Sequence, residues 1–448
     1  MLSLTALHAR ERERFADTHT RSRALFERAR ASLLDGVPMH WMRKWPGGFP
    51  VFVAEAKGAR FVDVDGNEYV DFCLGDTGAM TGHAPEPTLR ALAEQASRGI
   101  TLMLPTKDAL LVSEELTRRF GVASWQFALT ATDANRFAIR LARHVTGRPK
   151  VLVFDWCYHG TVDETFATLD ESGVVVARRG NLGPPVSPGE TTRVVEFNDV
   201  DGLERELAYG DVAVVLTEPA LTNVGIVHPE PGFHAALREL TRRHGALLAI
   251  DETHTICCGP GGYTGAHGLD PDIVTIGKPI GGGVPAAAYG FTSELAERVG
   301  ASIELEDVDV GGVGGTLAAN ALSLAAMRAT LSEVLTEEAF ARMISLAERW
   351  TAGVEGAIVD SGLPWHVTRL GCRAEYLFGP ERPRNGSVAH AAGDPALERY
   401  LHLHALNRGI LLTPFHNMAL MSPATTEEDV DLHTTAFREA TLELASSL

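Results

Sequence analysis

The stretch that decides the fold is IGKPIGGG (residues 276–283), taken together with AIDET (residues 249–253) upstream. Lys278 follows an apolar, mostly β-branched run at residues 273–276 and precedes a glycine triplet. This pattern predicts a buried strand that ends in a turn, with the lysine at the strand end. Burial there favours the uncharged, nucleophilic form of the amine.

Asp251 ends a second apolar run, residues 247–250, and the interval up to Lys278 leaves room for a helix and a strand. An aspartate and a lysine at neighbouring strand ends are the groups that a pyridoxal phosphate (PLP) enzyme requires. The lysine forms a Schiff base with the aldehyde, and the aspartate keeps the pyridine nitrogen protonated so that the ring withdraws electrons. A lysine beside a glycine turn is also a common surface feature, so the prediction depends on the rest of the chain.

The chain has 448 residues, enough for about two to three domains. Its 45% hydrophobic and 22% charged residues are typical of a globular protein, and its net charge of −18 argues against a nucleic-acid partner. No apolar run reaches membrane-spanning length, so we expect no membrane partner. The five cysteines are scattered without zinc-ligand spacing, which favours reduced thiols, a cytoplasmic location and no bound metal.

The terminal regions are expected to form a smaller domain. Residues 5–34 read as one long amphipathic helix, followed by a strand at 49–53 and a hairpin whose turn is Asp65-Gly66. We expect residues 1–80 to belong to the small domain, 81–320 to form a large cofactor-binding domain, and 321–448 to complete the small domain.

In the middle of the chain, helical patterns alternate with short apolar runs. The runs are residues 125–129, 151–154, 212–216, 247–250 and 273–276. Such alternation predicts an α/β fold with a mostly parallel sheet covered on both faces. Ligands bind at the carboxyl ends of such strands, and the candidate residues each come just after one of the runs: Thr130, residues 155–159, Glu218, Asp251 and Lys278.

Three further segments are candidates for cofactor contacts. TATDAN (residues 130–135) follows a strand and opens a helix, where backbone N–H groups and hydroxyls can hold a phosphate, although simple N-capping explains it equally well. Tyr158 follows a strand and can stack on a cofactor ring or serve as a core tyrosine. Thr316, in GGTL (residues 314–317), is a second phosphate candidate, whereas no glycine cluster fits a dinucleotide site.

These motifs together resemble the class III aminotransferases of PLP fold type I, and in particular their glutamate-1-semialdehyde aminomutase-like branch. The segments that carry the resemblance are VDVDGNEYVD (62–71), Gly82-His83, Asp251-Glu252, GKPIGGG (277–283), and Gly315-Thr316-Leu317 with Asn320. The resemblance covers nearly the whole chain. It implies a large domain with a seven-stranded, mostly parallel sheet and a smaller α/β domain built from both termini.

The resemblance also implies roles for individual residues. Lys278 is implied as the Schiff-base lysine and Asp251 as the partner of the pyridine nitrogen. Thr316 is implied to reach the phosphate of a neighbouring subunit, so a homodimer with shared active sites is expected. The remaining implied cofactor contacts are Thr130, Ala131 and Thr132 at the phosphate, Tyr158 at the ring, Glu218, and Asn223 near the phenolic oxygen.

The chain departs from the family pattern at several positions. The usual Ser-Gly-Thr-Glu-Ala phosphate segment is TATDA here, so Ala131 adds a methyl group and Asp133 shortens an acid. His254 and the Cys257-Cys258 pair also depart from the pattern. We interpret these changes as a specialised branch that keeps the cofactor, because the lysine, the aspartate and the tyrosine remain.

Two arginines are candidates for binding a substrate carboxylate. Arg43, in WMRKW (residues 41–45), lies where relatives place an arginine clamp, and bidentate pairing suits that task. The alternative is a surface arginine flanked by aromatic residues. Arg373 is the second candidate, and its alternative role is an ion pair with Glu375 or another acid.

The leading hypothesis is a PLP-dependent aminotransferase that moves an amino group between an amino acid or amine and a 2-oxo acid or aldehyde. An aminomutase of the glutamate-1-semialdehyde type or an amino-acid racemase is the alternative, because all three chemistries begin with the same Schiff base on Lys278. A non-enzymatic PLP-binding protein is least favoured, because the lysine–aspartate pair is intact.

Overall fold

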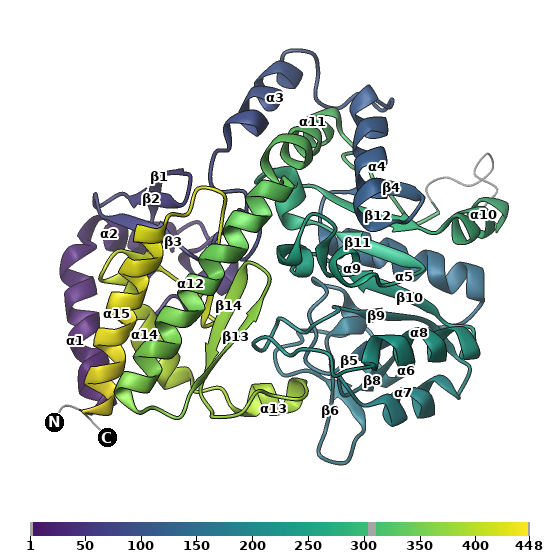
Figure 1. Cartoon of the computed structure of the whole chain (residues 1–448). Coiled ribbons are helices and arrows are strands. Elements are labelled where there is room, and N and C mark those ends of the chain that lie inside the picture. The colour runs from purple at the N-terminus through teal and green to yellow at the C-terminus, as the bar shows by residue number, and fades with distance from the viewer. Residues whose placement is uncertain (1–2, 303–310, 447–448) are drawn as a thin grey trace. The chain divides into compact units, whose positions relative to one another are not determined.

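The chain forms two compact units in this computed structural model, which describes residues 3–302 and 311–446 (Figure 1). The terminal unit comprises residues 1–85, 341–382 and 392–448, and the central unit comprises 86–340 and 383–391. The boundaries therefore fall at 85 and 340, where the sequence suggested 80 and 320. The helix α11 (Ala321–Ala329) stays with the central unit because it packs against α3 (Glu86–Ala96) and α4 (Lys107–Phe120).

The central unit is built on a seven-stranded sheet with the order β4-β12-β11-β10-β9-β5-β8. Only β12 runs antiparallel to its neighbours, so the predicted mostly parallel α/β fold is confirmed. The strands are β4 (Ser124–Ala128), β5 (Lys150–Phe154), β8 (Thr192–Val195), β9 (Val212–Thr217), β10 (Leu247–Asp251), β11 (Ile273–Ile276) and β12 (Ala287–Phe291).

Helices cover this sheet and explain its continuous apolar runs. Every residue of β9, β10, β11 and β12 is buried, as expected for strands covered on both faces. Helix α5 packs on β9, β11 and β12, while α8 packs on β10. The long helices of this unit beyond α3, α4 and α11 are α5 (Ala131–Thr146), α7 (Val200–Leu207), α8 (Phe233–His244) and α10 (Ser293–Ser302).

Shorter elements connect these layers. The strands β6 (Ala167–Leu169) and β7 (Val175–Ala177) form a separate hairpin. The short helical elements are η3 (Asp163–Thr165), α6 (Pro188–Thr191), η4 (Thr255–Cys258), α9 (Gly262–His267), η5 (Lys278–Gly281), η6 (Thr330–Val334) and α13 (Gly386–Ala391).

The terminal unit contains two small sheets, ordered β1-β2-β3-β15 and β13-β14-β16. Strand β15 pairs in parallel with β3, which joins the C-terminal segment to the N-terminal hairpin. Its strands are β1 (Val53–Lys57), β2 (Arg60–Asp63), β3 (Glu68–Asp71), β13 (His366–Leu370), β14 (Arg373–Leu377), β15 (Ile410–Leu411) and β16 (Met418–Leu420). Its helices are α1 (Leu4–Thr18), α2 (Thr20–Ala29), η1 (Leu34–Gly36), η2 (His40–Lys44), α12 (Glu337–Ser361, which begins in the central unit), α14 (Pro395–Leu406) and α15 (Glu427–Ala445).

The expectation of one helix over residues 5–34 is wrong, because the chain breaks between α1 and α2 at His19. This residue leaves the helical region at φ −124° and ψ 46°. Its buried ring hydrogen-bonds Tyr69 Oη at 2.6 Å, the Phe15 carbonyl at 2.8 Å and the Thr18 hydroxyl at 2.9 Å. The expected strand at 49–53 is also misplaced, since β1 begins at Val53 and Phe49 packs in a hydrophobic cluster instead.

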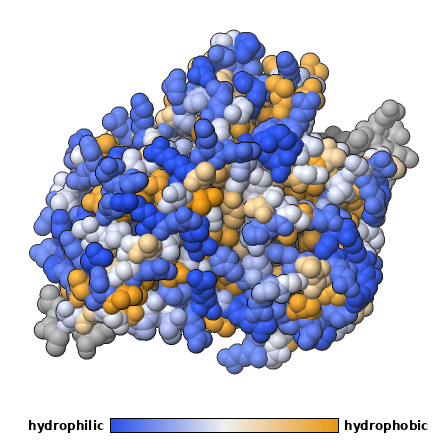
Figure 2. All heavy atoms as spheres, viewed as in Figure 1, coloured by the Kyte–Doolittle hydropathy of each residue, from blue (hydrophilic) through white to orange (hydrophobic). Residues whose placement is uncertain are grey.

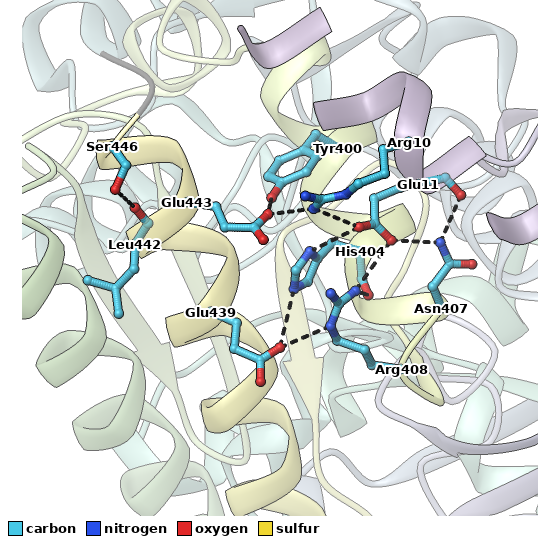
Figure 3. A network of polar contacts seen from close by, with 10 residues as sticks. All are labelled: Arg10, Glu11, Tyr400, His404, Asn407, Arg408, Glu439, Leu442, Glu443 and Ser446. Carbon is cyan, nitrogen blue, oxygen red and sulfur yellow. Dashed lines mark hydrogen bonds and ion pairs between the residues drawn. The ribbon is translucent and has the colours of Figure 1, made fainter. Parts of the chain in front are cut away.

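A buried carboxylate holds α1 against the C-terminal helices (Figure 3). Glu11, on α1, is 2% exposed and accepts hydrogen bonds from Arg10 (3.0 Å), Asn407 Nδ2 (2.8 Å) and Arg408 (3.3 Å). Arg10 also bonds Glu443 of α15 at 2.6 Å. Burial acts to raise the pKa of Glu11, but the Asn407 hydrogen bond and the Arg408 charge outweigh it and lower the pKa.

The surface view in Figure 2 shows a face on which hydrophilic residues predominate and hydrophobic residues gather only in small groups. Within residues 3–302 and 311–446, no helix is long and apolar enough to cross a bilayer. The same ranges contain no group of histidine, cysteine, aspartate and glutamate side chains that could hold a metal ion.

Replacing Glu11 with glutamine keeps the shape of the side chain and removes the charge that its donors share. We expect a loss of about 1–3 kcal/mol in the free energy of unfolding at pH 7. Because the folded-state pKa is lowered, the stabilisation is present above the ordinary carboxyl pKa of about 4.3 and is lost as pH falls through the lowered value. The gap between variant and wild type should therefore narrow in acid.

Urea unfolding at pH 7 and in acid measures this difference. The matched control is Glu27→Gln, because Glu27, on α2, forms an exposed ion pair with Arg30 just beyond the end of that helix. The control should stay within about 0.5 kcal/mol of wild type. Equal stabilities for the two variants at pH 7 would contradict the role given to Glu11.

Candidate cofactor-binding site

Asp251 and Lys278 lie at the carboxyl ends of two neighbouring strands. Asp251 is the last residue of β10, which pairs in parallel with β11, so that Asp251 lies opposite Thr275. Lys278 comes three positions after Thr275, in the turn that follows β11. The sheet therefore brings an acid and an amine to the edge where ligands of such sheets bind.

The carboxylate of Asp251 is buried and fully engaged. Its Oδ2 atom accepts hydrogen bonds from His159 Nδ1 at 2.9 Å and from Asn135 Nδ2 at 2.8 Å, while Oδ1 accepts one from the Thr253 backbone at 3.0 Å. Burial acts to raise the pKa of Asp251, but the hydrogen bond and the charge of His159 outweigh it, so the pKa lies below its ordinary value. Asp251 therefore stays ionised inside the protein.

Asn135 connects the elements around that carboxylate. It is completely buried on α5, and besides Asp251 its amide nitrogen bonds the His159 carbonyl at 3.2 Å. Its amide oxygen accepts a hydrogen bond from the Thr275 hydroxyl of β11 at 2.6 Å. Sequence reasoning did not single out Asn135, although a polar residue on the sheet-facing side of an amphipathic helix was the available signal.

The predicted phosphate segment forms the N-terminus of α5. Thr130 is the N-cap, and its hydroxyl oxygen accepts from the Asp133 backbone at 3.1 Å. Thr132 Oγ1 accepts from the Thr161 backbone at 3.0 Å. Ala131 lies close to Gly277, since a Cβ at Gly277 would be 3.0 Å from the Ala131 Cβ. The positive end of the helix dipole therefore lies against the residue that precedes Lys278, as an anion site requires.

Gly160, in the loop after β5, packs closely against Thr132 of this segment. Its φ of +77° is in the left-handed region, and a Cβ there would lie 2.2 Å from Thr132 Oγ1. The backbone of the loop after β5 can therefore approach the N-terminus of α5 only because residue 160 is glycine.

Glu218 and Asn223 secure the loop that carries Tyr158. Glu218 is buried and accepts from the Thr222 backbone at 3.1 Å, from the Thr222 hydroxyl, and from the Tyr158 backbone at 3.4 Å. Burial raises the pKa of Glu218. Asn223 Nδ2 donates to the Trp156 carbonyl at 3.0 Å. Both side chains thus contact the backbone of residues 156–158 and hold the Tyr158 backbone in position.

Lys278 is half-buried and has an unusual backbone. Its φ of +52° lies in the left-handed region, which costs a residue with a side chain about 1–2 kcal/mol. Such strain is concentrated at functional sites, where surrounding contacts hold it in place. The Nζ atom of Lys278 lies 2.8 Å from Nε2 of His254, a contact that sequence reasoning did not predict.

The other predicted site residues do not join this network. Thr316 is exposed in the turn that precedes α11. Arg43 and Arg373 belong to the terminal unit. The side chain of Arg43 is 33% exposed, donates to the Gly48 carbonyl at 3.2 Å and lies 4.7 Å from the centre of the Phe26 ring. Arg373 is fully buried on β14 and ion-paired with Glu375.

The residues of the central unit fit PLP. An ionised aspartate suits a protonated pyridine nitrogen, a helix N-terminus beside the Gly160 approach suits a phosphate, and Lys278 offers an amine at the same sheet edge. When bound, PLP supplies an aldehyde that takes up an amino group and a ring that withdraws electrons. The fold and the site together define a PLP-dependent enzyme of fold type I.

Comparison with known proteins narrows this class. The sequence pattern of the family "Aminotransferase class-III" matches residues 42–440. The chain belongs to the class III aminotransferase family.

Individual relatives agree with that assignment. The crystal structure of a glutamate-1-semialdehyde-aminomutase from Pseudomonas aeruginosa PAO1 is 54% identical, with a TM-score of 0.96 over 98% of each chain. A lysine-to-alanine variant of that enzyme was solved in complex with PMP. A glutamate-1-semialdehyde 2,1-aminomutase from Sorangium cellulosum is 36% identical over 95% of this chain and 97% of its own length. An omega-transaminase from Sphaerobacter thermophilus is 30% identical, with a TM-score of 0.86 over 95% of this chain and 98% of that one. The predicted PLP dependence is confirmed.

Substituting alanine for Gly160 tests the phosphate-side geometry. The added methyl group would lie 2.2 Å from Thr132 Oγ1, so the N-terminus of α5 or the loop after β5 has to shift. We expect the affinity for PLP to fall by about tenfold or more, since displacements of about 1 Å have large effects at preorganised sites. Absorbance titration of the PLP-free protein with PLP measures the change.

Gly173→Ala is the matched control. Gly173 has nearly the same φ, +78°, but its added Cβ would meet no atom within 4 Å. Both variants carry the same backbone strain, so the difference between them isolates the contact with Thr132. Equal PLP affinities in the two variants would show that the Gly160 approach does not form part of the cofactor site.

Proposed function

We propose that this enzyme moves an amino group between adjacent carbons of one small, carboxylate-bearing substrate, in the manner of a glutamate-1-semialdehyde 2,1-aminomutase. The observation that carries the proposal is the 54% identity over 98% of both chains with the Pseudomonas aminomutase. Curated relatives at 30–36% identity that bear the same name support it. The aminotransferase hypothesis drawn from the sequence becomes the second candidate.

The residues of the central unit have roles that suit this reaction. The amine of Lys278, when released from the cofactor, holds the proton that must leave one carbon and return to its neighbour. The charge of Asp251, held by His159 and Asn135, would keep the pyridine nitrogen of the cofactor protonated, so that the ring could accept electron density. Thr130, Ala131 and Thr132 would offer the N-terminus of α5 to the phosphate, and Tyr158 would stack on the ring. Asn223 and Glu218 contact the backbone of residues 156–158, which carries Tyr158.

Transamination between two substrates remains the second candidate. The 30% identity with the omega-transaminase supports it, as does a 27% identical β-phenylalanine aminotransferase from Variovorax paradoxus with a TM-score of 0.85. In transamination the donor leaves as a keto product and its amino group passes to a second molecule, whereas in the aminomutase reaction the amino group returns to the same carbon skeleton.

Arg43 is our choice for the group that binds the substrate carboxylate. Its guanidinium is partly exposed, and the only acid within ion-pair distance among the described residues is Asp35, at 3.6 Å. The charge of Arg373, by contrast, is already balanced inside the terminal unit by Glu375. Because Asp35 is itself exposed, the Arg43 guanidinium can exchange that ion pair for a bidentate pair with a substrate carboxylate, which makes it the better ligand.

We further propose a cytoplasmic homodimer with shared active sites. Thr316 is exposed on a glycine-rich turn of its own subunit, which is consistent with a hydroxyl that reaches the phosphate of the partner subunit. All five cysteines are free thiols, as a reducing compartment favours.

Incubation of the PLP-loaded enzyme with glutamate 1-semialdehyde, and with no second amino donor or acceptor, tests the proposed reaction. Exchange of the amino and oxo groups between carbons 1 and 2 converts this substrate to its isomer 5-amino-4-oxopentanoate. We expect many turnovers per active site, with the amine-free dioxo acid released at no more than about one equivalent per active site. Product formation that requires added pyruvate or 2-oxoglutarate would assign transamination instead, and inversion of configuration alone would assign a racemase.

The same assay tests Arg43. Removing one partner of a bound carboxylate pair costs about 2–5 kcal/mol, so Arg43→Gln should lower kcat/KM by roughly 30-fold or more. Arg23→Gln is the matched control, because Arg23 also lies over a phenylalanine ring of the terminal unit. A 30-fold loss in the control, or no loss in the Arg43 variant, would remove Arg43 as the carboxylate ligand.

A further inference from the structure

The contact between His254 and Lys278 has no role in the function proposed so far. His254 is 8% exposed and lies three positions after Asp251, in the turn that connects β10 to η4. Its Nε2 atom is 2.8 Å from the Nζ atom of Lys278. A neutral imidazole nitrogen at this distance can accept a hydrogen bond from an amine.

The turn that carries His254 is fixed at several points. The Glu252 backbone donates to the Thr275 carbonyl at 2.8 Å, which continues the pairing with β11. The Ile256 backbone donates to the Glu252 carbonyl at 2.9 Å, and the Cys257 backbone donates to the His254 carbonyl at 3.3 Å. The imidazole is therefore presented from a rigid backbone and not from a long loop.

The acids of the same turn are engaged elsewhere. Asp251 accepts hydrogen bonds from His159, Asn135 and the Thr253 backbone. Glu252 accepts from the Thr255 hydroxyl at 2.6 Å and from the backbones of Tyr263 at 3.0 Å and Thr264 at 2.5 Å. Gly262 makes this arrangement possible, because a Cβ there would lie 2.2 Å from the Glu252 carboxylate.

We propose that His254 is a positioning residue for the reactive lysine. Its Nε2 atom accepts a hydrogen bond from Nζ whenever the Lys278 amine is not attached to the cofactor. The proposal rests on the proposed function in that Lys278 is the proton-carrying amine. A lysine side chain has several freely rotating bonds, so one fixed acceptor restricts where its amine lies.

The consequence is that the amine stays at the sheet edge between successive steps. Once released, Lys278 has to deliver a proton to a carbon next to the one from which it came, and later it has to re-form its bond to PLP. Both events require the Lys278 amine to stay close to the reacting carbons. His254 lies in the turn after the neighbouring strand β10, which is held by its pairing with β11, so its hydrogen bond keeps the amine at that position.

Three substitutions at position 254 test whether His254 acts as a hydrogen-bond acceptor or only fills space. His254→Leu removes the acceptor at similar bulk. His254→Gln places an amide oxygen near the position of Nε2, whereas His254→Asn carries its amide at the level of Nδ1 and falls short. His267→Leu is the matched control, because His267 is an exposed histidine on α9 that stacks on Tyr263.

Two measurements are made on each variant. The first is the rate at which PLP attaches covalently to Lys278 in the PLP-free full-length protein, followed by absorbance with no substrate present. The second is kcat and KM in the amino-group transfer assay. We expect His254→Leu and His254→Asn to slow attachment and lower kcat by about tenfold or more, with KM within about threefold of wild type. His254→Gln should recover most of both rates, and His267→Leu should match wild type.

The attachment rate is independent of which substrate is correct, so failure of the aminomutase proposal leaves this test intact. Wild-type attachment and kcat in His254→Leu would overturn the proposal. Equal losses in His254→Gln and His254→Leu would also overturn it, because a glutamine acceptor would then have no effect. Thermal unfolding of all four variants identifies any that lose the fold. If His254→Leu is one of them, the comparison of His254→Gln with His254→Asn decides whether an acceptor near the position of Nε2 is required.

Discussion

The buried charge of Asp251 is the constraint on which the rest of the site depends. An isolated carboxylate inside a sheet protein would be strongly unfavourable, so it has to be paired and hydrogen-bonded. His159 supplies the opposite charge from the loop after β5, and Asn135 supplies an amide from α5. Satisfying this one group therefore fixes three separate segments, which are the segments proposed to contact the phosphate, the ring and the pyridine nitrogen.

The parallel sheet supplies the remaining geometry. Because β10 and β11 run side by side, the turn with His254 and the turn with Lys278 emerge at the same edge. The same packing explains one departure from the family pattern. Ala131 carries a methyl group where the family pattern has glycine, and this methyl group lies against Gly277, where an added Cβ would come within 3.0 Å of it. The extra methyl group is thus accommodated without moving the helix from the lysine turn.

Much of this arrangement could be predicted from the sequence. The apolar runs before Asp251 and Lys278 predicted buried strands with functional residues at their ends, because burial on both faces leaves a clear hydrophobic signal. The strands β8 and β12 were not predicted. The signal of β12 was weak, since it consists of alanine, glycine and two aromatic residues.

The missed features depend on tertiary contacts. The break at His19 follows from a hydrogen bond to Tyr69, fifty positions away, which no local helical pattern contains. Asn135 and His254 likewise gain their roles only when α5, β10 and β11 come together. The sequence indicates that His254 departs from the family pattern, but only the pairing of β10 with β11 shows that it contacts the lysine.

Covalent trapping of the cofactor tests the central claim most directly. Reduction of the PLP-loaded protein with borohydride, followed by proteolysis and mass spectrometry, identifies the lysine that carries the cofactor. The account predicts the label on the peptide that contains Lys278, and no labelled lysine in a Lys278→Ala variant. A label on any other lysine, with Lys278 unmodified, would contradict the site described for this sheet edge.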